Sequence, residues 1–143
     1  MAQHVYNTLR TRPTVQAAIG NPVRLKNIGV LPPNTALPAA LHYAETGTYG
    51  GPISAIDPPD TENLSYIVRF ICQGESDAPI RAAAKDALHA LSVDAYQATV
   101  VQDGESFYLT LDPTNEWLIT TTVEDGVIYR QLGFYLAATV NRL

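Results

Sequence analysis

One stretch of sequence decides the fold: Leu64-Ser-Tyr-Ile-Val-Arg-Phe-Ile-Cys-Gln-Gly-Glu-Ser-Asp-Ala-Pro-Ile-Arg-Ala-Ala-Ala-Lys-Asp-Ala-Leu-His-Ala-Leu91. Its first part, residues 64–72, is the most apolar strand-like run in the chain and predicts a central strand of a sheet. Its second part predicts an amphipathic helix over residues 77–91, because apolar side chains recur there at the spacing of one helix face. This face consists of Ile80, Ala83, Ala84, Ala87, Leu88 and Leu91. A face so rich in Ala suits a helix that lies close against a sheet.

The sequence after this unit is mostly β, with two hairpin signals. Asp103-Gly104-Glu105 separates the predicted strands 98–102 and 106–111. Asp-Gly between two β-forming runs is a strong signal for a tight hairpin. We therefore predict a hairpin over residues 98–111, and we interpret Asp112-Pro113 after it as a turn.

A second hairpin of the same kind is predicted at Glu124-Asp125-Gly126, between strands 117–123 and 127–140. Alternate residues of the last strand are apolar, from Ile128 to Val140, which predicts one core-facing side. In its partner strand, Trp117, Ile119, Thr121 and Val123 share one face.

The sequence before the central unit predicts shorter elements. Short helices are expected over residues 4–10 and 13–19, and Gly20 ends the second. Strands are expected over residues 23–28 and 39–44. Residues 46–62 are rich in Gly and Pro and show no periodicity, so we interpret them as a long loop. This loop carries Tyr49, Ile53 and Ile56, and we hypothesise that it docks onto a neighbouring subunit.

Composition limits the class of protein. The chain has 143 residues, 46% of them hydrophobic and only 16% charged. That length predicts a single domain, and the hydrophobic fraction argues against intrinsic disorder. The formal net charge of -5 argues against a protein that grips nucleic-acid phosphates. We see no signal peptide and no apolar run long enough to cross a bilayer, so we expect synthesis and use in the cytoplasm.

No motif for catalysis, cofactor binding or metal binding is found in the sequence. The single cysteine, Cys72, lies in the apolar run and is interpreted as a small buried hydrophobe rather than a nucleophile. His4, His42 and His89 fall on three different predicted elements, which disfavours a shared metal site. The expectation is therefore a protein with no catalytic, cofactor-binding or metal-binding residues.

The order of these elements resembles a known family. A short helix beginning His4-Val-Tyr-Asn-Thr-Leu precedes a strand around Val23-Arg-Leu-Lys and a proline-led strand, Leu37-Pro-Ala-Ala-Leu-His-Tyr43. The strand–helix unit and the long last strand, Val127-Ile-Tyr-Arg-Gln-Leu-Gly-Phe-Tyr-Leu-Ala-Ala-Thr-Val140, complete the pattern. This order is similar to that of the tail terminator (tail completion) proteins of long-tailed bacteriophages, such as that of phage lambda.

The resemblance implies an α+β fold. A mostly antiparallel twisted sheet would carry one main helix and a short N-terminal helix on one face, with the hairpin 98–111 and the loop 46–62 projecting. It also implies a homo-hexameric ring at the tail–neck junction of a virion, assembled in the host cytoplasm. The ring would cap the tail tube protein, end its polymerisation and join a neck or head-completion protein. Genomic DNA would pass the lumen without specific binding, and no membrane would be involved.

The candidate contact residues are Tyr49, Ile53 and Ile56 in the loop and Asp103, Gly104 and Glu105 at the hairpin tip. Two other interpretations stay open. One is another virion protein: a head-completion or adaptor protein of the neck, or a minor tail protein. The other is a small α+β enzyme or ligand-binding domain, with its site between the sheet and the loop 46–62.

Overall fold

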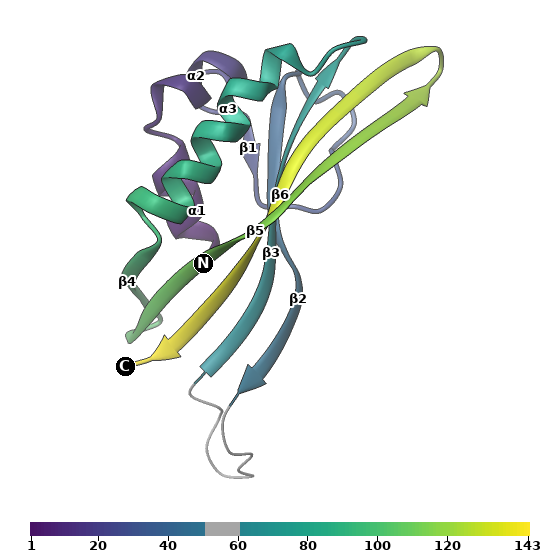
Figure 1. Cartoon of the computed structure of the whole chain (residues 1–143). Helices are drawn as coiled ribbons and strands as arrows, with labels where there is room; N and C mark the ends of the chain where they lie inside the picture. Colours follow the sequence, from purple (N-terminus) through teal and green to yellow (C-terminus); the bar gives the residue numbers. More distant parts are fainter. Residues whose placement is uncertain (51–60) are drawn as a thin grey trace.

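Three α-helices lie against one face of a six-stranded sheet in the computed structural model, which describes residues 1–50 and 61–143 (Figure 1). The described elements are, in chain order, α1 (Ala2–Leu9), α2 (Pro13–Ile19), β1 (Leu25–Lys26), β2 (Ala39–Gly50), β3 (Thr61–Gln73), α3 (Ala78–His89), the π-helical turn η1 (Ala90–Asp94), β4 (Gln97–Gln102), β5 (Glu105–Glu124) and β6 (Val127–Arg142). The strand order is β1-β2-β3-β6-β5-β4. Only β1 and β2 are parallel, so the predicted α+β fold with a mostly antiparallel sheet is confirmed.

The two strands predicted to be central are central. β3 and β6 pair without a register shift from Thr61 opposite Asn141 to Gln73 opposite Tyr129. β3 is apolar on both faces because both are covered. Its side chains from Tyr66 to Cys72 are buried, apart from Arg69, which is half-buried.

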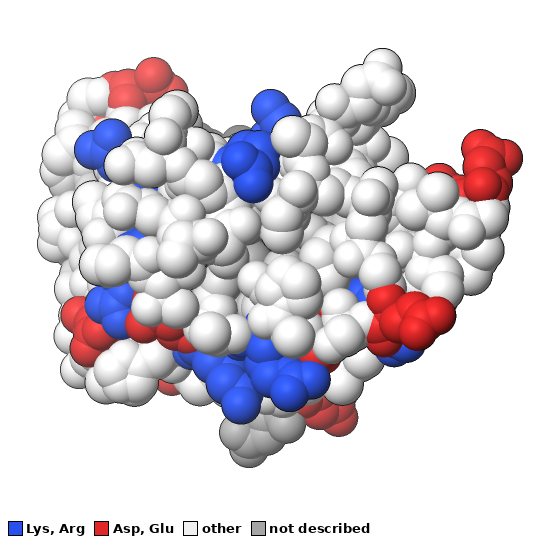
Figure 2. All heavy atoms as spheres, turned by 90° about the horizontal axis from the view of Figure 1, so that it is seen from above, with Lys and Arg blue, Asp and Glu red and all other residues white. Residues whose placement is uncertain are grey.

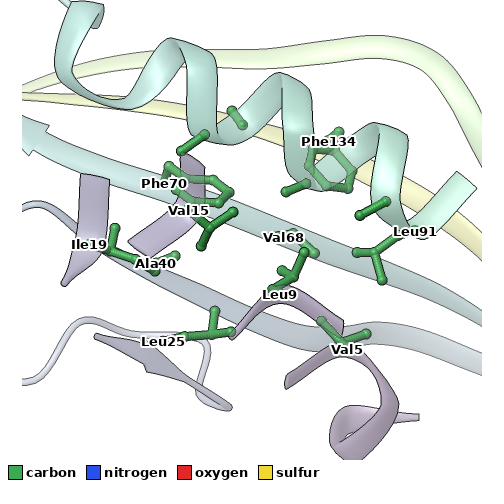
Figure 3. Packing of buried hydrophobic residues seen from close by; sticks show 14 of the residues in the cluster. Val5, Leu9, Val15, Ile19, Leu25, Ala40, Val68, Phe70, Leu91 and Phe134 are labelled. Carbon is green, nitrogen blue, oxygen red and sulfur yellow. The ribbon is translucent and has the colours of Figure 1, made fainter. Parts of the chain in front are cut away.

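The main core lies between the sheet and the helices (Figure 3). Ile80, Ala83, Ala84 and Ala87 of α3 are buried, as the sequence predicted, and the small Ala side chains let the helix axis approach the sheet. Phe70 and Phe134 fill the space beneath α3. The N-terminal helices add Val5, Leu9, Val15 and Ile19 to the same core. Leu91, predicted at the helix end, is buried in η1.

The opposite face of the sheet is covered by the connection between β1 and β2 (Figure 1). Arg69 holds this connection: one of its guanidinium nitrogens donates to the carbonyl of Gly29 at 2.9 Å, and its head lies over the Tyr43 ring. Leu41 and Ile71 on this face are buried as well. This second cover explains why residues 64–72 read as an apolar run rather than as an alternating pattern.

The structure corrects the bounds of the predicted loop. Residues 46–50 belong to β2 and residues 61–62 to β3, which pair as far as Gly50 opposite Thr61. The sequence pattern of residues 46–50 did not predict a strand, because Gly and Thr alternate in this segment and give it no hydrophobic face. Ile53 and Ile56 lie outside the described residues. The strand predicted over residues 23–28 is also shorter, since only Leu25–Lys26 is β.

Both predicted Asp-Gly turns are confirmed. Asp103 and Gly104 have φ of 53° and 77°, and Asp125 and Gly126 have 51° and 78°, the left-handed values that a two-residue hairpin turn needs. The turn predicted at Asp112-Pro113 is wrong. These residues lie within β5, which runs unbroken as a strand from Glu105 to Glu124 with one register shift between Pro113 and Trp117. Pro113 is tolerated because this part of β5 forms the edge of the sheet.

We expect Gly133→Ala to destabilise the fold by about 1–3 kcal/mol, because β3 leaves no room for a methyl group. A Cβ at this position would lie 2.8 Å from the carbonyl oxygen of Val68 and 2.9 Å from Cγ of Arg69. Chemical denaturation measures the change. Gly29→Ala is the matched control, since its Cβ would meet the Tyr43 ring at an ordinary 3.7 Å. Equal stability of Gly133→Ala and the unmodified protein would contradict the close approach of the two strands.

We also expect the fold to lose stability in mild acid through His42. This side chain is buried with Nδ1 2.7 Å from the Tyr66 hydroxyl oxygen, and burial, helped by the charged N-terminus, lowers the pKa of His42 to about 4. In the unfolded chain the histidine takes up its proton at about pH 6.5. The free energy of unfolding is therefore highest above that pH, and it decreases by about 3 kcal/mol as the pH falls to about 4.

Thermal unfolding across pH 4–7 tests this expectation. His42→Gln should remove the histidine-dependent part of the decline, whereas His89→Gln, at an exposed position, should keep it. An unchanged pH profile for His42→Gln would show that another group causes the decline.

Candidate assembly surface

Four of the six residues predicted from the sequence to make contacts lie at one end of the sheet, and the other two, Ile53 and Ile56, lie outside the described residues. Asp103, Gly104 and Glu105 form the exposed turn between β4 and β5. Tyr49 lies in β2, opposite Glu62 of β3. The paired rows of the sheet run from Gly50 through Thr61 and Asn141 to Tyr108, so the end of β2 and the β4–β5 hairpin share this end of the molecule.

A larger exposed feature lies at the other end of the sheet. β4 pairs with β5 only over residues 105–110, so from residue 112 onward β5 is the edge strand of the described sheet. Beyond this point β5 and β6 continue as a long hairpin that curves away from the helices (Figure 1). We name residues 117–131 the arm, and residues 117–123 its edge segment.

The edge segment has unusual chemistry for a solvent-exposed strand. Its sequence is Trp117-Leu118-Ile119-Thr120-Thr121-Thr122-Val123, without a charge, Gly or Pro. Ile119 is 67% exposed and Val123 is 65% exposed. Protein edges are normally protected by charges, Pro or bulges, because an apolar uncharged edge pairs with other chains. The edge segment therefore has the character of a surface that a partner covers.

Sequence analysis found the face of these side chains but missed their exposure. Trp117 and Ile119 point to the helix side of the sheet, opposite Phe134 and Leu132 of β6. Trp117 rests edge-on against Phe134, with ring centroids 5.8 Å apart. The helices cover the centre of the sheet and the arm curves away from them, so Ile119 and Val123 stay uncovered. The sequence feature that could have indicated this exposure is the uncharged run at residues 117–123.

Charge is distributed unevenly around the arm. Glu124 and Asp125, both exposed, form its tip. Figure 2 shows acidic groups at the right-hand side of the molecule, and groups of Lys and Arg nearer its middle. A surface that covers the arm must therefore suit both an apolar strand and an acidic tip.

A cavity of about 580 Å³ lies between the β1–β2 connection and the arm, lined among others by Arg69, Gln131, Tyr129, Thr122 and Glu124. The guanidinium of Arg69 is held in place by the carbonyl of Gly29 and by Oε1 of Gln131, at 3.1 Å. These contacts give Arg69 a structural role, because they fix the β1–β2 connection to the sheet.

The residues capable of chemistry are dispersed. His4 lies 2.9 Å from the carbonyl oxygen of Ala95, His42 contacts Tyr66, and His89 lies 3.4 Å from Asp94. Burial raises the pKa of the Cys72 thiol, with a smaller contribution from Asp77, which keeps the sulfur protonated and unreactive. No cluster of three His, Cys, Asp or Glu side chains that could hold a metal ion is found in residues 1–50 and 61–143. No helix in these two ranges is both long and apolar enough to cross a membrane.

Comparison with solved structures shows a similar fold in a chain of the virion of a native gene transfer agent (GTA) particle. The two structures match with a TM-score of 0.57 over 96% of this chain and 91% of that chain, at 17% sequence identity. Searches of protein-family models and of curated proteins found no match. The likeness is therefore one of fold, and it extends over nearly the whole of both chains.

We expect the double substitution Ile119→Lys, Val123→Lys to leave the free energy of unfolding within about 0.5 kcal/mol of the unmodified value, because both side chains already face solvent. Phe134→Ala, in the buried layer beneath α3, should cost about 3–5 kcal/mol. Urea titrations of both variants measure the difference. A large loss for the double variant would show that the arm belongs to the folded core.

Proposed function

We propose that this chain is a structural protein of a phage-like virion and acts there as a tail terminator. In this role it forms a homo-hexameric ring that caps the tail tube, ends tube polymerisation and joins the tube to the neck or head. One observation carries the proposal: the fold matches a virion chain over nearly the full length of both proteins. The order of elements in the sequence, which resembles that of tail terminator proteins, supports the finer assignment.

The surface of the molecule suits this role. A ring subunit works through contacts with its neighbours, and the edge segment is an exposed apolar strand of the kind that a neighbour covers. The function needs no reaction centre. With -5 on each chain, six copies would carry about -30, so the lumen would repel DNA and let it pass.

We assign the end of the sheet that holds the β4–β5 turn to the contact with an adjacent ring. Asp103, Gly104 and Glu105 are exposed there, at the same end as Tyr49 in β2. Ile53 and Ile56, which sequence analysis proposed as apolar anchors, lie outside the described residues. The tail tube protein on one side and a neck or head-completion protein on the other are the proposed partners.

Particles made without this protein should contain tails of uncontrolled length that carry no heads, because nothing ends tube polymerisation or offers the joint. Negative-stain imaging of the particles measures tail length and head attachment. Supplying the unmodified gene from a plasmid is the control and should restore tails of one length.

The same images separate the rival interpretations. Tails of normal, uniform length that lack heads would assign the chain to a neck or head-completion role and contradict the terminator role. Complete particles of normal appearance would contradict a structural role in the virion, and the ligand-binding or enzymatic interpretation would then take its place.

A further inference from the structure

We propose that two copies of the free chain pair through their edge segments, antiparallel, about a two-fold axis at Thr121. The pair covers the apolar edge of the arm before the chain enters an assembly. Adjacent copies in a closed six-fold ring are not related by a two-fold axis, so the pair must open when the proposed ring forms. Two-fold contacts, in which both copies use the same surface, are the commonest contacts between identical chains.

The backbone of the edge segment has hydrogen-bonding groups that point out of the sheet. In an antiparallel ladder, successive residues direct their N–H and C=O groups alternately to one side and to the other. The N–H of Gly74 donates to the carbonyl oxygen of Ile128 at 2.9 Å, so Ile128 faces β3 and the next residue, Tyr129, faces β5. Tyr129 lies opposite Thr122, which therefore faces β6. The outward-facing residues of the edge segment are the odd-numbered ones, Trp117, Ile119, Thr121 and Val123.

The side chains at these positions complement themselves in one register. When Thr121 lies opposite Thr121 of the second copy, Ile119 lies opposite Val123 of the second copy, and the reverse holds for the other copy. Ile119 and Val123 are both exposed in the single chain. Opposed apolar side chains and Thr–Thr pairs stabilise antiparallel strands. The pair therefore removes apolar surface from water that one chain leaves exposed.

Charge selects this register over its neighbour. With the axis at Thr121, Glu124 lies opposite Leu118 of the second copy. With the axis at Thr120, Glu116 would lie opposite Glu124 at both ends of the pair. Like charges directly opposite each other destabilise a strand pair. The register at Thr121 therefore keeps the acidic residues that flank the edge segment apart.

The described part of the sheet leaves room for the second copy. β4 covers β5 only as far as Thr110, opposite Gln97. The tip of the second copy's arm would reach no further than Glu116. The axis stands perpendicular to the sheet, so the two sheets join edge to edge and the helices of both copies lie on the same face. Two short strands form a small interface of the weak, reversible class, as a contact that must open requires.

A backbone variant tests the strand pairing. Thr121→Pro removes the outward N–H at the centre of the pair and leaves the ladder with β6 intact, because an edge strand tolerates Pro where its N–H faces solvent. Thr121→Val is the matched control, since it keeps both the N–H and the β-branched shape. Light scattering after size-exclusion chromatography over a concentration series measures the mass, and unfolding curves show that each protein is folded.

We expect the unmodified chain and Thr121→Val to form dimers in a concentration-dependent way. Thr121→Pro should associate about tenfold more weakly or less, because the pair loses a backbone hydrogen bond on each side of the axis.

A charge swap tests the register and does not depend on the Pro variant. Ile119→Lys with Val123→Lys places Lys opposite Lys in the pair, and Ile119→Glu with Val123→Glu places Glu opposite Glu. Each double variant should be monomeric alone, and an equal mixture should form heterodimers, because every Lys then meets a Glu. With the axis at Thr120, the new charges would instead face Thr121 and Trp117, and mixing would restore nothing.

Four outcomes would overturn the pair. An unmodified chain that stays monomeric at every concentration would show that edge segments do not bind each other. A ring rather than a dimer in solution would contradict the pair and support the proposed function. Equal dimerisation of Thr121→Pro and Thr121→Val would place the contact on another surface, and monomers in the charge-swapped mixture would contradict the register. The terminator role is decided separately, by imaging of particles made without the protein.

Discussion

The pairing of β3 with β6 is the constraint on which the rest of the structure depends. Thirteen consecutive residue pairs, from Thr61–Asn141 to Gln73–Tyr129, join segments far apart in the sequence without a shift. This pairing brings Phe70 next to Leu132 and supplies the apolar surface on which α3 packs. It also fixes where β5 and β2 join on either side, and so sets both edges of the sheet. Gly133 of β6 has no space for a side chain, because a Cβ there would meet β3.

Polar contacts then fix the covering layers in place. Arg12, at the start of α2, binds Asp86 of α3 at 2.7 Å and Asp94 of η1 at 2.9 Å, and its guanidinium lowers the pKa of the Asp86 carboxyl. These groups are partly exposed, so their role is to orient the helices more than to stabilise them. Arg69 acts similarly on the opposite face, where it ties the β1–β2 connection to the sheet. The helices cover the centre of the sheet and leave the arm free.

The separation between a covered sheet centre and an uncovered arm explains how one small chain can have a complete core and still present an exposed apolar strand. Ile119 and Val123 are exposed, so the core between the helices and the sheet forms without them.

The sequence by itself determined the elements whose signals are local. The apolar run of β3, the Ala-rich face of α3 and both Asp-Gly turns depend on neighbours a few residues away, and they are confirmed. Other features depend on contacts between distant segments. Asp112-Pro113 reads as a turn, and only the pairing of β5 with β6 makes it part of a strand. Trp117, Ile119 and Val123 were predicted to share one face, and only the curvature of the arm leaves Ile119 and Val123 on that face exposed. Alternation shows which side chains share a face, but the tertiary structure decides whether anything covers that face.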